Sequence, residues 1–157
     1  MLVENPYPQD IRIRNETLLL KDAGYEVTVI ALRAKAQRLW EILDGIHVLR
    51  LPTIEIFKKT DPESSNRLSA FLLKSKAAFG YILEYVYFTT ACSLITTYRA
   101  LTRGFDVIHA HNPPDTLFLV ALPFKLLGKK FVFDYHDLCL ELYLSRYSAQ
   151  SGFLTAA

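Results

Sequence analysis

Residues 2–31, which read LVENPYPQDIRIRNETLLLKDAGYEVTVIA, predict a strand, a helix and a second strand in succession. Asp10 is a good N-cap for a helix that begins at Ile11, because its carboxylate can accept hydrogen bonds from unpaired backbone N–H groups. Gly24 stands where helix ends commonly adopt a left-handed conformation. Residues 25–31 then form a nearly continuous apolar run, as in a strand buried on both faces. This order is a βαβ unit, which places its two strands parallel.

The rest of the chain continues the same alternation of strands and helices. The turn signal Asp44-Gly45 precedes the next apolar run, and Gly104 and Gly128 end later helical stretches. The predicted segments are a strand over 46–51, a helix over 67–103 that breaks near Gly80, a strand over 105–110, a helix over 112–127 that kinks at Pro123, and a strand over 130–135. We therefore expect an α/β fold with a mostly parallel sheet and helices on both faces.

The composition of the chain excludes several classes of protein. The chain has 157 residues, of which 51% are hydrophobic, so it can bury the core of one domain and is not disordered. Its 18 basic and 16 acidic residues give a net charge of +2, which is too small for a dedicated nucleic-acid binder. Cys92 and Cys139 are far apart, which excludes a disulfide scaffold and favours a reducing compartment. No apolar leader follows Met1, so we expect a cytoplasmic protein.

Polar residues gather where three of the predicted strands end. In open α/β sheets, ligands bind at the carboxyl ends of the strands. The candidates are Asn5, Tyr7, Gln9 and Asp10 after the first strand, His109, His111, Asn112 and Asp115 around the end of the 105–110 strand, and His136 and Asp137 after the last.

Structural roles compete with functional ones at these positions. His109 lies inside a strand, where a hydrogen-bonded core histidine is the ordinary interpretation. Asn112, Asp115 and Asp137 can each serve as helix N-caps. We expect His111 to lie beyond the strand end and outside the core. The convergence of three strand ends is therefore the main signal for a binding site.

The sequence motifs of several enzyme classes are absent from this chain. There is no G-x-G-x-x-G after the first strand and no G-x-x-x-x-G-K-[ST] anywhere, which disfavours dinucleotide oxidoreductases and P-loop NTPases. No serine sits in a G-x-S-x-G elbow, which disfavours an α/β-hydrolase.

Three segments resemble the N-terminal domain of family 4 glycosyltransferases with the GT-B fold. They are NPYPQDIRIRNE (5–16) followed by AGYEVTV (23–29), FDVIHAHN (105–112), and FDYHDLCLELY (133–143), which has Leu140 where the family pattern has proline. They occur in the family's order, and the resemblance spans about residues 2 to 147.

The resemblance implies a Rossmann-like half of a GT-B enzyme and an expected activity. Such enzymes transfer a sugar with retention from a nucleotide-sugar donor to a glycan or lipid-linked acceptor, as in polysaccharide biosynthesis, and we expect no metal or other cofactor. The N-terminal domain mainly receives the acceptor. The resemblance implies that His111 lies near the reacting sugar. It also implies that the loop from Asn5 to Asp10, together with His136, Asp137 and Glu141, faces the cleft.

We expect residues 1–157 to form this N-terminal domain alone, truncated at both ends and without the donor-binding domain. The isolated chain would then be inactive. Two alternatives stay open. One is a metal-dependent hydrolase that uses His109, His111, Asp134 and His136, because alternate strand residues face one way and offer metal ligands. The other is a non-catalytic module, or remnant, that pairs with a separate donor domain.

The stretch from Ala77 to Tyr98 is long and apolar, with Glu84 as its one charged residue. Its length could span a bilayer, but Glu84 and the scattered tyrosines favour a buried or cleft-lining helix. The flanking basic residues Arg67, Lys74, Lys76, Arg99 and Arg103 suit an anionic membrane surface. We therefore also expect peripheral contact with the inner face of a membrane.

Overall fold

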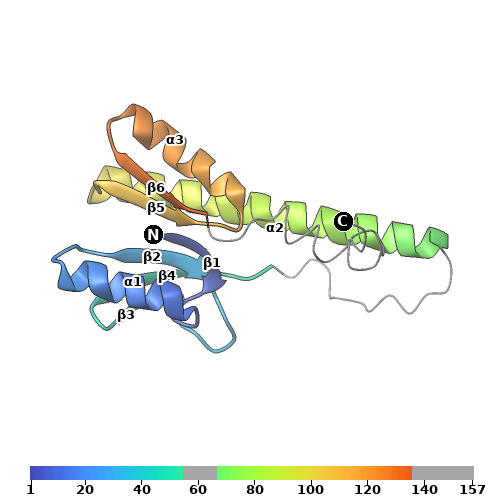
Figure 1. Ribbon diagram of the computed structural model, residues 1–157, viewed down its shortest axis with the longest axis horizontal. Helices are drawn as coiled ribbons and strands as arrows, with labels where there is room; N and C mark the ends of the chain where they lie inside the picture. Colours follow the sequence, from blue (N-terminus) through green and yellow to red (C-terminus); the bar gives the residue numbers. More distant parts are fainter. Residues whose placement is uncertain (55–66, 136–157) are drawn as a thin grey trace, which may run out of the picture.

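The computed structural model describes residues 1–54 and 67–135, and over 67–78 it describes the backbone only. The elements follow the predicted alternation, with one additional strand (Figure 1). In chain order they are β1 (Leu2–Pro6), α1 (Ile11–Asp22), β2 (Thr28–Leu32), β3 (Trp40–Leu43), β4 (Ile46–Leu51), α2 (Arg67–Thr102), β5 (Val107–His111), the 3-10 turn η1 (Asp115–Leu117), α3 (Phe118–Leu126) and β6 (Lys130–Asp134).

The predicted ends of α1 are confirmed. The Asp10 carboxylate accepts a hydrogen bond from the backbone N–H of Arg12, and Gly24 has a φ of +90°. The backbone N–H of Tyr25 donates to Leu20 O, so the residues after Gly24 still complete the helix end. For this reason β2 begins at Thr28 and not at residue 25.

The expected break in the long helix is wrong, because α2 runs without interruption from Arg67 to Thr102. A glycine inside a helix lowers stability by only about 1 kcal/mol relative to alanine, so Gly80 alone does not stop it. The helix predicted over 112–127 is divided into η1 and α3, after Pro113 and Pro114, and Pro123 lies inside α3.

The strand β3 was missed by the sequence analysis. It pairs antiparallel with β4 through a tight hairpin at Asp44 and Gly45, both of which have positive φ. An Asp-Gly pair in that conformation is a preferred two-residue hairpin turn. Trp40 and Ile42 are exposed on this edge strand, so the segment lacks the buried apolar pattern that identified its neighbours.

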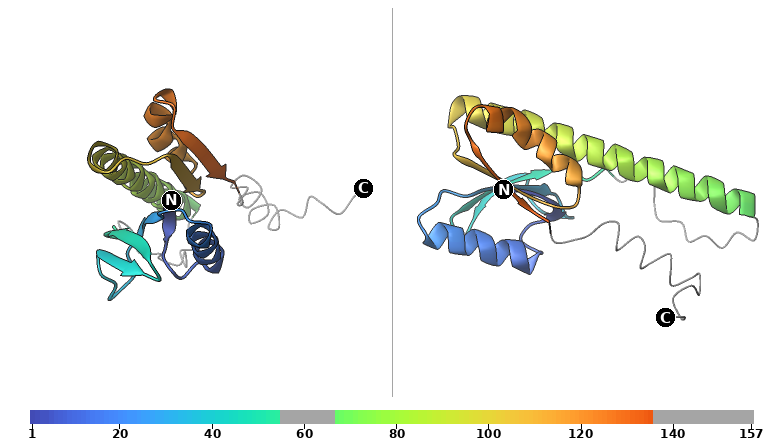
Figure 2. Two further views of the ribbon diagram at one scale, coloured as in Figure 1. Left: turned by 90° about the vertical axis from the view of Figure 1, so that its left-hand side faces the viewer. Right: turned by 45° about the horizontal axis from the view of Figure 1, so that its top comes forward.

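The six described strands form one sheet in the order β3-β4-β2-β1-β5-β6, and every pairing except β3–β4 is parallel. Helix α1 lies on one face of the sheet, and α2 and α3 lie on the other (Figures 1 and 2). The predicted Rossmann-like α/β class with helices on both faces is confirmed. The parallel order brings the carboxyl ends of β1, β5 and β6 to the same edge.

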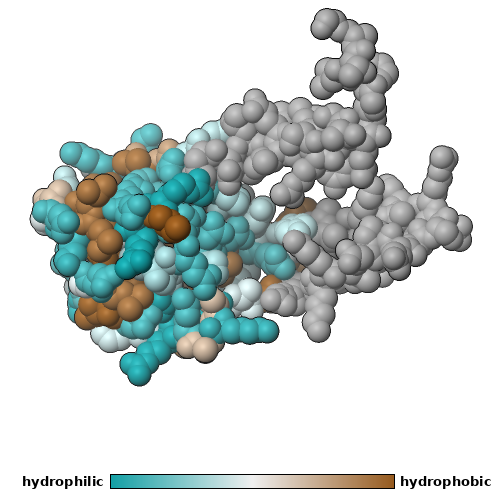
Figure 3. Space-filling view, turned by 60° about the horizontal axis from the view of Figure 1, so that its bottom comes forward, coloured by the Kyte–Doolittle hydropathy of each residue, from teal (hydrophilic) through white to brown (hydrophobic). Residues whose placement is uncertain are grey.

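Each face of the sheet has its own core. On the α1 face, Ile13 packs with Val3, Val29 and Val48, among others. On the opposite face, Phe88 and Cys92 of α2 and Phe124 of α3 pack against residues that include Ile108 and Ala110 of β5. The outer surface on the α1 side carries hydrophobic residues in separate groups among hydrophilic ones (Figure 3).

The helix α2 extends well past the sheet (Figure 1). Its 36 residues span about 54 Å at the usual helical rise. Among the residues that the structure describes, no helix combines the length and the apolar character needed to cross a membrane.

Candidate functional site

The strand β5 presents two histidines on the α1 face of the sheet. Its alternate residues, Ile108 and Ala110, belong to the core under α2 and α3, so His109 and His111 point the other way. The two imidazole rings stack with their centroids 4.3 Å apart. The strand therefore supplies a preformed pair of imidazoles at its carboxyl end.

His111 is held by a carboxylate of the neighbouring strand. Its Nδ1 lies 3.0 Å from Oδ2 of Asp134, the last residue of β6. Since an ionised carboxylate only accepts hydrogen bonds, this contact requires a proton on Nδ1. The Nε2 atom of His111 then lies 3.7 Å from Oε2 of Glu16 in α1. The hydrogen bond to β6 therefore orients this ring, and α1 lies beside it.

The contact between His109 and Glu16 is not an ion pair at neutral pH. Nδ1 of His109 lies 3.1 Å from Oε1 of Glu16. Burial, together with the neighbouring His111, lowers the pKa of His109 to about 4. Burial and the charge of Asp134 raise the pKa of Glu16. The His109 imidazole is therefore neutral where it lies beside the Glu16 carboxyl group.

The residues after β1 are divided between the surface and the core. Asn5 and Gln9 are exposed, and Nδ2 of Asn5 donates to Asp10. Burial of the Asp10 carboxyl would raise its pKa, but hydrogen bonds from Arg12 and Asn5 hold that pKa below its usual value. Tyr7 is buried, and its hydroxyl lies 2.8 Å from Oγ1 of Thr17. Its side chain is therefore part of the core.

The residues that follow β5 lie at the same edge of the sheet as the end of β6. The backbone N–H of Asn112 donates to the carbonyl oxygen of Asp134, which ties the ends of β5 and β6 together. The Asn112 side chain is buried and donates to Asp115 across 3.4 Å, and Asp115 is exposed at the start of η1. The predicted site residues His136, Asp137 and Glu141 lie outside the described residues.

Two features of this site differ from the sequence analysis. The expectation that His111 lies outside the core is wrong, because the residue is the last of β5 and only 2% exposed. Glu16 was quoted in a motif but not proposed as a site residue. It lies between Ile13 and Thr17, the buried residues of α1, so helical periodicity could have placed it on the inward face.

Glu4 is a second carboxyl that the sequence analysis did not single out. Burial raises its pKa to about 7, with a further contribution from the negative charge of Glu84 in α2. Glu4 belongs to β1, two residues before the strand ends. A carboxyl that titrates near neutrality at this edge of the sheet is a further candidate for proton transfer.

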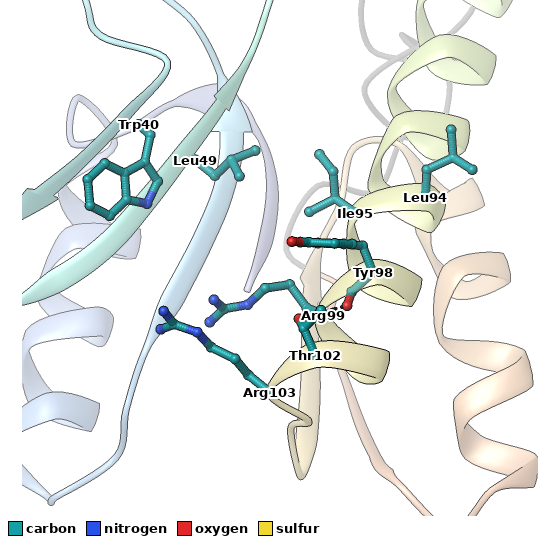
Figure 4. Close-up of a pocket in the computed structure, with 8 residues that line it drawn as sticks. All are labelled: Trp40, Leu49, Leu94, Ile95, Tyr98, Arg99, Thr102 and Arg103. Atoms are coloured by element: carbon teal, nitrogen blue, oxygen red, sulfur yellow. Dashed lines mark hydrogen bonds between the residues drawn. The ribbon is translucent and has the colours of Figure 1, made fainter.

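A hollow between the sheet edge and α2 lies apart from these residues (Figure 4). Trp40 and Leu49 line it from β3 and β4, and five residues between Leu94 and Thr102 line it from α2, together with Arg103 just after the helix. Its volume is about 440 Å³. None of the predicted site residues lines this hollow, so the candidate site is the edge formed by β1, β5 and β6.

Comparison with known proteins identifies the family of this chain. The family described as a glycosyl transferase 4-like domain matches residues 11–157, which include α1 and all of the described strands except β1. No curated protein and no solved structure matches the chain. The matched segment is most of the chain, and this chain therefore belongs to the glycosyl transferase 4-like domain family.

Proposed function

We propose that this domain forms the acceptor side of a retaining glycosyltransferase, which moves a sugar from a nucleotide-sugar donor to a glycan or lipid-linked acceptor. Membership of the glycosyl transferase 4-like family supports a sugar-transfer activity. The observation that carries the proposal is the edge where β1, β5 and β6 end side by side. At that edge, the His111 imidazole is fixed by Asp134.

A fixed imidazole suits the chemistry of this reaction. Glycosyl transfer requires an acceptor hydroxyl close to the sugar carbon and a stabilised leaving phosphate. Positioning and preorganised hydrogen bonding supply much of the rate enhancement in such sites. Because the hydrogen bond to Asp134 keeps the proton on Nδ1, the Nε2 atom of His111 is the ring atom that can accept a hydrogen bond. We assign to His111 the positioning of the reacting sugar.

The proposal also assigns donor recognition to a second domain. The 157-residue chain alone should therefore show no saturable binding of UDP-, GDP- or ADP-sugars tighter than millimolar. Isothermal titration across that panel of donors is the measurement. Mixing or fusing the chain with a compatible donor-binding domain should then restore transfer to an acceptor.

Two outcomes would contradict this assignment. A micromolar dissociation constant for any donor on the isolated chain would place donor binding in this domain. Absence of transfer with every donor domain, for a chain that is folded by circular dichroism, would favour a non-catalytic module instead.

We further propose that the projecting part of α2 contacts an anionic membrane surface, at its cytoplasmic side, where a lipid-linked acceptor would be found. Phe79, Ile82 and Val86 are all more than half exposed. Their spacing of three and four residues places them on one stripe of the helix. Basic residues at positions 67, 74 and 76 precede this stripe in the sequence. Apolar and basic residues together suit a charged bilayer surface.

Binding to vesicles tests this contact. The chain should bind vesicles that contain anionic lipid, bind neutral vesicles weakly, and lose binding as salt rises, because the Debye length is about 8 Å at physiological ionic strength. The double variant Phe79→Ser/Ile82→Ser should bind about 10-fold or more weakly, since each buried apolar side chain contributes roughly 1.5–3 kcal/mol. Cosedimentation measures both effects.

The matched control replaces two exposed apolar residues of α1, Ile11→Ser/Leu19→Ser, and should leave vesicle binding unchanged. Equal binding to anionic and neutral vesicles, or equal loss in the two double variants, would show that α2 is not the contact surface.

A further inference from the structure

We propose that Glu16, His109 and His111 form a binding site for a divalent metal ion of the Zn²⁺ type, which joins α1 to β5. The inference stands on the geometry of these three side chains and does not depend on the transfer activity proposed above. Each residue offers one ligand atom, and the three atoms lie within 4.8 Å of one another. The site is tested by metal binding itself.

Two distances between donor atoms of this cluster are close to the distances between ligands of a bound ion. Zinc bonds nitrogen and carboxylate oxygen at about 2.0–2.2 Å, so two ligands of a tetrahedral site are roughly 3.3–3.5 Å apart. Nδ1 of His109 lies 3.1 Å from one oxygen of Glu16, and Nε2 of His111 lies 3.7 Å from the other. Small side-chain rotations would therefore bring all three atoms to bonding distance.

The surroundings of His111 match the usual support of a metal-binding histidine. Such a histidine donates its second ring N–H to a carboxylate or carbonyl, which fixes the tautomer and orients the ring. Asp134 accepts that hydrogen bond from Nδ1, at 3.0 Å. Nε2 is thereby left with its lone pair on the side of the ring where Glu16 lies.

The three ligands stand on regular secondary structure and an ion can reach them. His109 and His111 are alternate residues of β5, and Glu16 lies in the second turn of α1. The Glu16 side chain is 35% exposed. His109 also lines a hollow of about 890 Å³, which is bordered by the first residues of β1, β2, β5 and β6. The site is thus preorganised on two rigid elements and open on one side.

The donor set selects the class of metal. Two imidazoles and one carboxylate favour borderline ions such as Zn²⁺ and Co²⁺, whereas Mg²⁺ and Ca²⁺ prefer oxygen ligands. Three protein ligands also leave a fourth position for water or another small ligand. The simpler alternative is that Glu16 only accepts a hydrogen bond from His109, in which case the cluster binds no ion.

The test uses the metal-free 157-residue chain with Zn²⁺ in competition with a chromogenic chelator, and with Co²⁺ followed by visible absorption. We expect one site with a micromolar or tighter dissociation constant, weak binding of Mg²⁺, and a tetrahedral Co²⁺ spectrum without a thiolate band. Zinc at 100 times its dissociation constant should raise the melting temperature by about 5–10 °C.

Two variants and a matched control locate the site. Glu16→Gln and His109→Gln should each weaken Zn²⁺ binding at least 10-fold, while His47→Gln, on the distant strand β4, should leave it unchanged. Circular dichroism checks that each variant is folded. Failure of the unaltered chain to bind Zn²⁺ at 100 µM, binding that persists in both variants, or a thiolate band with Co²⁺ would overturn the proposal. These outcomes are read from metal binding alone, and sugar transfer, which is proposed to use the same Nε2 atom of His111, is assayed separately without added metal.

Discussion

Replacing His111 with alanine should lower the rate of sugar transfer by about 10²-fold or more when the domain is assayed with a donor-binding domain. The reason is the position of the imidazole, which stands at the carboxyl end of β5 and is oriented by Asp134. Removing a preorganised hydrogen-bonding group from a reaction site has an effect of this size. The measurement is the transfer rate at saturating donor, per mole of folded protein.

Because His111 is buried, the stability of each His111 variant must be measured as well as its rate of sugar transfer. The substitution leaves Asp134 without its imidazole partner, and loss of such a buried hydrogen bond lowers stability by about 1–3 kcal/mol. His111→Gln keeps more of the side-chain volume than His111→Ala. Its transfer rate therefore reports the loss of the imidazole with a smaller loss of packing. Both variants should transfer slowly while still folded.

The control is His47→Ala, which removes a histidine from β4 and should transfer at the parental rate. Asp134→Asn tests the orienting contact, because an amide can present its nitrogen to His111 and so favour the other tautomer. It should slow transfer less than His111→Ala. Transfer at the parental rate by folded His111→Ala would show that this histidine has a structural role only.

Local signals in the sequence were sufficient for most of the fold. Asp10 and Gly24 fixed the limits of α1, and the apolar run over 46–51 coincides with β4. These features depend on a few neighbouring residues, which is why they can be recognised without tertiary information. The edge strand β3 was missed because its outward residues Trp40 and Ile42 are apolar, so it shows no clear alternation.

Several residues of the candidate site could be predicted from the sequence, but the way in which they pack could not. The strand-end motifs pointed to His111 and Asn112, and the parallel sheet places their strand between β1 and β6. Burial of His111, however, depends on how β6 and α1 lie against β5, which no local pattern encodes. Glu16 was missed for the same reason, since its partners are more than 90 residues away in the sequence.

A second contact that no local pattern predicts is the buried guanidinium of Arg50 in β4, which is 2% exposed. It donates two hydrogen bonds to the carbonyl oxygen of Tyr7, at 3.2 and 3.0 Å, and one to the carbonyl of Arg38 at 2.9 Å. It also pairs with Glu41 of β3 at 2.5 Å. Arg50 therefore joins the loop after β1, which leads to the candidate site, to the β3–β4 hairpin.

Arg50→Met should lower the free energy of unfolding by about 3–5 kcal/mol, because it leaves the partly buried Glu41 carboxylate without its partner and removes the hydrogen bonds to the carbonyls of Tyr7 and Arg38. The melting temperature should fall by roughly 10 °C in a chain of this size.

Arg38→Met is the matched control, since Arg38 is exposed and contributes only its carbonyl to this contact, and its effect should stay within about 0.5 kcal/mol. Adding Glu41→Leu to Arg50→Met should recover part of the loss, because the unpaired charge is then removed. Equal melting temperatures for Arg50→Met and Arg38→Met would mean that the guanidinium does not hold the loop. In that case other contacts would hold the residues between β1 and α1, such as the hydrogen bond between Tyr7 and Thr17 and the one from Gln37 to the Tyr7 carbonyl.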